Sequence, residues 1–97
     1  MMVSGEIMEH ELKSSPEFFQ PTIEGRKRHE LRRNDDRKFQ VGDIVVLREF
    51  DHGTKSYTGR TVRARISYIT SREYPCALSP EALGENYCIL SLDILES

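Results

Sequence analysis

The sequence predicts an α+β domain built on a small, mostly antiparallel, five-stranded β-barrel with one short helix near its N-terminus. Several segments alternate apolar and polar residues with the period of two that is typical of strands. One early segment carries the start and stop signals of a helix, and no strand–helix–strand rhythm follows it. Because the chain has 97 residues, we expect residues 1–7 to be a loose, flexible end and residues 8–97 to form a single domain.

The first strand is expected at residues 8–13, where the alternation places His10 on the apolar face as a core histidine. The Ser-Pro-Glu sequence that follows is a helix start, and the helix should run over residues 16–24. Gly25 should stop this helix, since glycine adopts the left-handed conformation at little cost. Pro21 lacks a backbone donor, so we expect a kink or a split there.

Residues 25–33 bring together a glycine, five Lys or Arg side chains, a carboxylate and an imidazole. After the glycine they are expected to form a short strand with Arg28, Glu30 and Arg32 on one face. A carboxylate between two guanidiniums could hold both arginines ready for an anionic ligand. The alternative that this stretch leaves open is an exposed edge strand that its charges keep soluble.

Three further strands are expected after this stretch. Residues 44–50 begin with four apolar residues in succession, which indicates a strand covered on both sides. Residues 61–70 and residues 87–95 alternate with a period of two, as half-buried antiparallel strands do. Residues 51–56 are expected to be a loop, and residues 71–86 a longer loop that holds one helical turn.

The net charge is only −2, but the charges are unevenly distributed. Residues 26–72 carry thirteen basic and six acidic side chains. Residues 1–25 carry one lysine and five glutamates, and residues 73–97 carry five acidic side chains and no basic one. A basic block between acidic ends indicates a local site for a polyanion. The alternative is that the blocks neutralise one another in the folded chain.

Composition argues against several other classes. Cys76 and Cys88 form no C-x-x-C motif, and the three histidines are scattered, so neither a metal site nor a cofactor is expected. No apolar run is long enough to cross a membrane. The first residues lack the features of a signal peptide, and the expected location is therefore the cytoplasm.

A family resemblance rests on motifs between residues 10 and 60. These motifs are His10-x-Leu12-Lys13, Pro16-x-x-Phe19, Gly25-x-Lys27-x-x-Glu30-x-Arg32, Asn34-Asp35, Phe39-x-Val41-Gly42-Asp43 and Leu47-x-Glu49. The chain thereby resembles the ASCH/PUA-like superfamily and, within it, the small bacterial and phage branch known as DUF3850. The resemblance implies a barrel with a helix beside a basic cleft, in a superfamily associated with RNA binding and RNA modification. It also implies that Lys27, Glu30 and Arg32 line the cleft.

The first functional hypothesis is a module that binds RNA, or a nucleotide or nucleoside, through this basic cleft. Lys and Arg would contact phosphates, and an aromatic side chain could stack on an unpaired base. Tyr57, in a basic loop, is a better candidate for stacking than Phe50 or His52, and Tyr68 is expected in the core. The full set of candidate binding residues is Lys13, Arg26, Lys27, Arg28, Glu30, Arg32, Arg33, Arg48, Tyr57, Arg63 and Arg65.

Catalysis is the second hypothesis. Some compact ASCH proteins similar to this one are amidohydrolases that use a lysine, a threonine and a glutamate. Lys27 falls on the lysine position, but Glu30 stands where those enzymes have threonine, so Lys27 as base or nucleophile and Glu30 as proton shuttle are the candidates. A ribonuclease would instead combine Lys27 with His10 or His29. The third hypothesis is a protein-interaction domain whose arginine face meets an acidic partner, although the sequence does not identify that protein.

Overall fold

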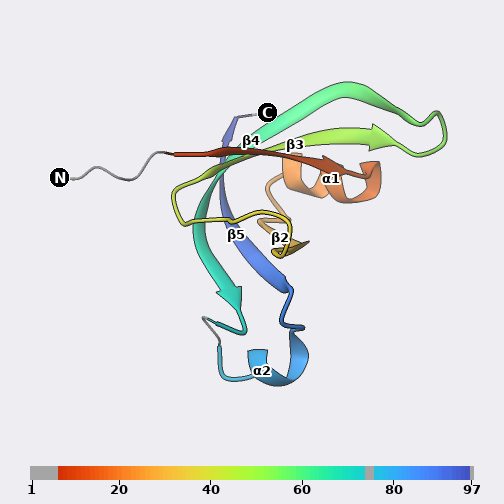
Figure 1. Cartoon of the computed structure of the whole chain (residues 1–97). Helices are drawn as coiled ribbons and strands as arrows, with labels where there is room; N and C mark the ends of the chain where they lie inside the picture. Colours follow the sequence, from red (N-terminus) through yellow and green to blue (C-terminus); the bar gives the residue numbers. More distant parts are fainter. Residues whose placement is uncertain (1–6, 74–75, 97) are drawn as a thin grey trace.

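The protein is a half-barrel formed by one five-stranded mixed sheet and two short helices (Figure 1). The structure, a computed structural model, describes residues 7–73 and 76–96. The expected flexible end at residues 1–7 lies outside the described residues except for Ile7. No helix in the described part of the chain is long and apolar enough to cross a membrane.

The five expected strands are present, and β1 and β2 form the two edges of the sheet. In chain order the elements are β1 (Glu9–Ser14), α1 (Pro16–Ile23), β2 (His29–Arg33), β3 (Ile44–Asp51), β4 (Ser56–Ser71), α2 (Ser79–Ala82) and β5 (Tyr87–Glu96). The strand order is β1-β3-β4-β5-β2, with β1 parallel to β3 and the other pairings antiparallel. Because β1 and β2 do not pair in the described part of the chain, the closed barrel that the sequence predicted is not seen.

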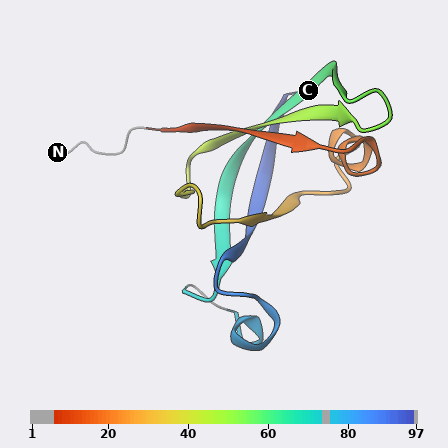
Figure 2. The same ribbon diagram turned by 45° about the vertical axis from the view of Figure 1, so that its right-hand side comes forward.

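The core lies on the concave side of the sheet, where α1 packs. Phe19 of α1 is fully buried and belongs to the same cluster as the inward side chains of β3, β4 and β5. Figures 1 and 2 show α1 beside the C-terminal ends of β1 and β3, and α2 at the far end of β4 and β5. The alternation expected for β4 and β5 is confirmed for the buried residues Val62, Ala64, Ile66, Cys88, Leu90 and Leu92.

α1 ends as its sequence indicates. Gly25 has a φ of +81°, which favours glycine, and its N–H donates to the Thr22 carbonyl at 3.0 Å. The Pro21 carbonyl accepts the N–H of Lys27 at 3.1 Å, so the chain folds back under the helix. Pro21 does not split the helix, which continues to Ile23. The turn therefore brings Lys27 to the start of β2.

Tyr68 is not in the core, which corrects the prediction from alternation. Its exposed fraction is 57%, because the register between β4 and β5 shifts between Ile66 and Tyr68. Ile66 pairs with Leu92 and Tyr68 with Ser91, so one extra residue lies in β4 and Ile69 takes the inward position opposite Leu90. The predicted loop at residues 51–56 is also shorter than expected. β4 begins at Ser56 rather than at residue 61, so Tyr57, which was expected in a basic loop, lies in β4.

His10 faces inward, as predicted, and has a buried acidic partner. Its Nε2 lies 2.8 Å from Asp43 Oδ2, and the ring packs on Phe39 with centroids 4.7 Å apart. Asp43 also accepts the N–H groups of Met8 at 3.3 Å and Gln40 at 3.0 Å. These contacts tie the start of β1 to the turn that precedes β3, so His10 is accounted for by the fold.

Candidate functional site

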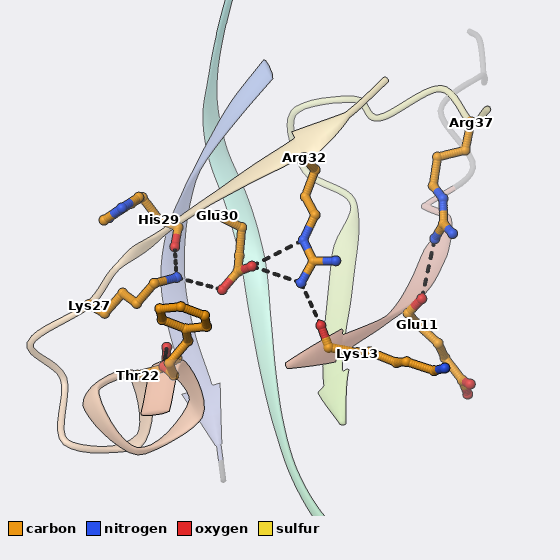
Figure 3. Close-up of polar contacts among 9 residues, drawn as sticks. Glu11, Lys13, Thr22, Lys27, His29, Glu30, Arg32 and Arg37 are labelled. Carbon is orange, nitrogen blue, oxygen red and sulfur yellow. Dashed lines mark hydrogen bonds and ion pairs between the residues drawn. The ribbon is translucent and has the colours of Figure 1, made fainter. Parts of the chain in front are cut away.

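The candidate site lies at the open seam between β1 and β2, where one arginine spans the two strands. Arg32 of β2 donates from Nη2 to the backbone carbonyl of Lys13 in β1 at 2.6 Å (Figure 3). β1 pairs with β3 on its other side, so this carbonyl belongs to the free edge of the sheet. A side chain thus closes the seam in place of a strand pairing.

Glu30, with an exposed fraction of 5%, holds Arg32 in this position. Glu30 Oε1 accepts Nε and Nη2 of Arg32 at 3.1 and 2.9 Å, and its Oε2 accepts Lys27 Nζ at 2.7 Å (Figure 3). Lys27 Nζ also donates to the His29 carbonyl at 2.6 Å. A buried carboxylate with two cationic partners is a fixed, charge-assisted cluster.

The prediction that Glu30 clusters with Arg28 and Arg32 is right for Arg32 and wrong for Arg28. β2 begins only at His29, so Arg28 precedes the strand and does not follow its alternation. The Arg28 side chain is exposed, and its carbonyl accepts the N–H of Leu92 at 2.9 Å. Lys27 takes the place expected for Arg28, because the turn after α1 directs it back towards Glu30.

A hollow of about 370 Å³ opens beside Arg32. Four of its lining residues are cationic, and Glu11 is its only acidic member. The formal charge of the lining is therefore +3. The lining residues are Glu11, Leu12, Lys13, Arg32, Arg37, Arg48 and Tyr57.

Two further arginines of the hollow are held by Glu11. Arg37 Nη1 donates to the Glu11 backbone carbonyl at 3.3 Å (Figure 3), and Arg48 Nη1 lies 3.3 Å from Glu11 Oε1. The Arg48 guanidinium also lies over the ring of Tyr57, 4.0 Å from the ring centroid. Arg37 was not among the candidates predicted from the sequence, and its position within the basic block at residues 26–72 was the only signal for it. Lys13, Arg48 and Tyr57 were candidates, and the fold brings all three to the hollow.

An aromatic group borders the hollow on the β3–β4 hairpin. The ring of Phe50 meets the rings of His52 and Tyr57 edge to face, each at a centroid distance of 5.1 Å. Lys13 Nζ lies 4.3 Å from the Phe50 centroid, and His52 Nε2 lies 3.0 Å from Ser15 Oγ. Such cation–π contacts keep the basic groups close to apolar ring faces.

Comparison of the sequence with known proteins shows the family of the chain. Residues 9–92 match the family model of the domain of unknown function DUF3850. The chain belongs to this family. The DUF3850 chain is also 41% identical over 61 residues to the "Uncharacterized 12.9 kDa protein in GpA 3'region" of Escherichia phage P2. That match covers 63% of the chain and 53% of the relative, so the chain spans about half the length of the protein it matches.

Several candidates of the DUF3850 chain lie away from the hollow beside acidic residues. Arg26 pairs with Glu24 at 2.6 Å, Arg33 with Asp35 at 2.6 Å and Arg63 with Glu9 at 2.9 Å. Hydrogen bonds, first from Gln20 and then from Arg26, lower the pKa of the Glu24 carboxyl, and the bond from Arg33 lowers the pKa of Asp35. Arg65 of β4 stands opposite Asp93 of β5 in the sheet register. The structure does not bring these candidates to the seam.

A second, larger hollow of about 890 Å³ lies between residues 34–41 and the ends of β4 and β5, where Tyr68 and Cys88 contribute to its lining. Its charges are mixed, since Asp35, Asp36 and Glu73 line it together with Arg37 and Lys38. Neither hollow is lined by Lys27 or Glu30. The described residues of the DUF3850 chain contain no group of three or more His, Cys, Asp or Glu side chains that could hold a metal ion.

Proposed function

We propose that this protein binds RNA, or a nucleotide, through the hollow at the seam between β1 and β2. The observation that carries the proposal is the concentration of Lys13, Arg32, Arg37 and Arg48 around one hollow with a single acidic residue. Clustered cations at a concave site are the electrostatic signature of a polyanion site. Of the three residues that the resemblance to the ASCH/PUA-like superfamily implies for its basic cleft, Arg32 lines this hollow, whereas Lys27 and Glu30 stand behind Arg32 and position it.

The held arginines support binding further. Arg32, Arg37 and Arg48 donate hydrogen bonds to acceptors on β1 or on Glu30. Each guanidinium has more N–H donors than these contacts use. A ligand phosphate would therefore meet donors that are already oriented, which lowers the entropic cost of binding.

The hydrolase alternative has less support. Lys27 Nζ donates to Glu30 and to the His29 carbonyl, and an ammonium group held in this way offers no lone pair for attack. No nucleoside-sized hollow containing both Lys27 and Glu30 is present among those described. The cluster formed by Lys27, Glu30 and Arg32 supports a positioning role better than an acid–base pair.

Fluorescence anisotropy with a short labelled single-stranded RNA tests the proposal. The wild type is expected to bind, and the affinity should fall steeply between about 50 mM and about 200 mM salt as counterions return to the phosphates. Arg37→Ala/Arg48→Ala should weaken binding by roughly tenfold or more and flatten the salt dependence. Arg72→Ala is the matched control, because Arg72 is exposed and follows the end of β4 opposite to Tyr57.

The outcomes separate the alternatives. Absence of binding by the wild type at low salt overturns the proposal. Equal weakening by Arg72→Ala would show that general charge, and not the hollow, attracts the RNA. Cleavage of the RNA during the incubation, abolished by Lys27→Ala, would favour the nuclease alternative.

A further inference from the structure

We infer that the hollow at the seam between β1 and β2 binds a terminal phosphate monoester. The ligand is then a nucleotide or the phosphorylated end of an RNA rather than an internal stretch of RNA. This inference rests on the proposed function and names the ligand group that the hollow takes. Three features carry it: the concentration of four cations around one small hollow, the donors along the edge of β1 and the position of Arg48 over Tyr57.

The positive charge of the hollow is compact, because Lys13, Arg32, Arg37 and Arg48 all line a volume of about 370 Å³. An extended polynucleotide site needs a basic groove that follows several phosphates. Arg32, Arg37 and Arg48 each have a carboxylate nearby, but the lining as a whole keeps a formal charge of +3. Five of the six basic candidates outside the hollow are spread over the surface and have an acidic partner or an acidic cross-strand neighbour. The five are Arg26 with Glu24, Lys27 with Glu30, Arg33 with Asp35, Arg63 with Glu9 and Arg65 opposite Asp93.

The edge of β1 supplies donors at closely spaced positions. Arg37 binds the carbonyl of Glu11 and Arg32 binds the carbonyl of Lys13, two residues further along the same edge. The N–H and C=O groups of one strand residue point to the same side. The N–H of Lys13 therefore points into the seam between the two guanidiniums, where no strand of the described part of the chain pairs with it.

This set of donors matches a monoester better than a diester. A terminal phosphate carries a charge of about −1.5 to −2 at neutral pH and three acceptor oxygens, whereas an internal phosphodiester carries one charge and two free oxygens. Arginine forks bind such oxygens in pairs. The lining charge of +3 and the volume of about 370 Å³ fit one such group with its attached nucleoside.

Arg48 provides a place for the attached base. One face of its guanidinium lies over the ring of Tyr57 at 4.0 Å. A base can stack on the planar guanidinium of an arginine as well as on an aromatic ring, and Tyr57 behind Arg48 fixes that plane. The phosphate would then lie against Arg32 and Arg37, with the base on Arg48.

The test compares one short RNA sequence with a 5′-phosphate, with a 3′-phosphate and with hydroxyl groups at both ends, using anisotropy at constant salt. A terminal phosphate is expected to raise the affinity by roughly tenfold, which is the order of one additional charge-assisted contact pair. The gain should vanish in Arg37→Ala and persist in Arg72→Ala. Preference for the 5′ or the 3′ form identifies the end that is bound.

Competition by uridine monophosphate and by inorganic phosphate separates the possible sources of the phosphate. If the mononucleotide displaces the phosphorylated RNA and inorganic phosphate displaces it more weakly, the hollow is a binding site for a phosphate with an attached base. Equal affinity for the three RNAs overturns the inference and leaves the proposed function intact, because internal phosphates would then suffice. Absence of binding for all three RNAs and for the mononucleotide overturns both.

Discussion

The guanidinium of Arg32 lies 2.6 Å from the backbone carbonyl of Lys13 and thereby joins the two edges of the sheet. The same guanidinium is fixed by Glu30, which lies two residues earlier on β2 and is almost fully buried. One side chain consequently serves two purposes: it holds the half-barrel together at its open side and it lines the basic hollow. Stability and ligand binding should therefore be coupled at this residue.

Arg32→Ala is expected to lower the free energy of unfolding by about 2–4 kcal/mol. The substitution removes two hydrogen bonds to a buried carboxylate and the bond across the seam, and breaking a buried ion pair leaves a poorly compensated charge. Glu30 keeps Lys27 as a partner, so the loss should stay below that for a fully isolated charge. Urea unfolding of the wild type and the variant measures the difference.

Arg33→Ala is the control for this measurement. It changes the neighbouring residue of the same strand and removes the same charge, but the pair of Arg33 with Asp35 is exposed and should contribute almost nothing to stability. Equal unfolding midpoints for Arg32→Ala and the wild type would contradict the bridging role of Arg32.

Glu11→Gln is expected to strengthen binding of the phosphorylated RNA by roughly two- to fivefold, because it removes the only carboxylate in the lining of the hollow. The backbone carbonyl of Glu11, which holds Arg37, remains in place. Anisotropy titrations measure the change, with Glu17→Gln as a control that alters the same charge on the exposed side of α1. Weaker binding by Glu11→Gln would show that the carboxylate is needed to position Arg48.

Stability should also depend on pH through Cys88. Burial raises the pKa of its thiol, so the folded chain keeps this proton at pH values where the unfolded chain has released it. The contribution of Cys88 is complete below about pH 8.5, where a free thiol is protonated, and is lost as the pH rises through the folded pKa. A difference of one pKa unit corresponds to about 1.4 kcal/mol.

The measurement compares the free energy of unfolding at neutral pH and at about pH 10 for wild type and Cys88→Val, which keeps an apolar side chain of similar size. The wild type should lose more stability than the variant over this range. Cys76→Ser retains the buried thiol. Because the hydrogen bond from Ser79 lowers the pKa of the exposed Cys76 thiol, this variant should lose at least as much stability as the wild type. Equal losses for wild type and Cys88→Val would rule out the thiol as the cause.

Helix start and stop signals predicted the short first helix, and the apolar run at the start of residues 44–50 predicted β3. Period-two alternation predicted most of the other strands and most of the inward side chains, because each strand has one buried face. It failed at Tyr68, since the extra residue in β4 is a property of the pairing with β5 and leaves no mark in the local pattern. The alternation also gave Glu30 the wrong second partner. The backbone turn at Gly25, and not the strand period, decides that Lys27 reaches the carboxylate.

The hollow was less accessible to sequence reasoning than the strands. Its members come from β1, β2, β3, β4 and the connection that contains Arg37, so their proximity depends on the strand order and on a long-range closure of the sheet. The charge block at residues 26–72 predicted where basic side chains occur along the chain. It could not distinguish those that face the seam from those that pair with Glu9, Glu24 or Asp35.

Ser14→Ala is expected to raise the free energy of unfolding by about 1 kcal/mol. Ser14 lies at the end of β1 opposite Glu49, has an exposed fraction of 4%, and its buried hydroxyl has no hydrogen-bond partner in the described part of the chain. Burying an unpaired hydroxyl is unfavourable by about 1–3 kcal/mol, and alanine removes the group without opening a sizeable cavity. Urea unfolding measures the gain, with Ser67→Ala as the control at an exposed position of β4. A loss of stability in Ser14→Ala would instead show that the hydroxyl is satisfied in solution by a buried water, which would make the end of β1 next to the seam a hydrated site.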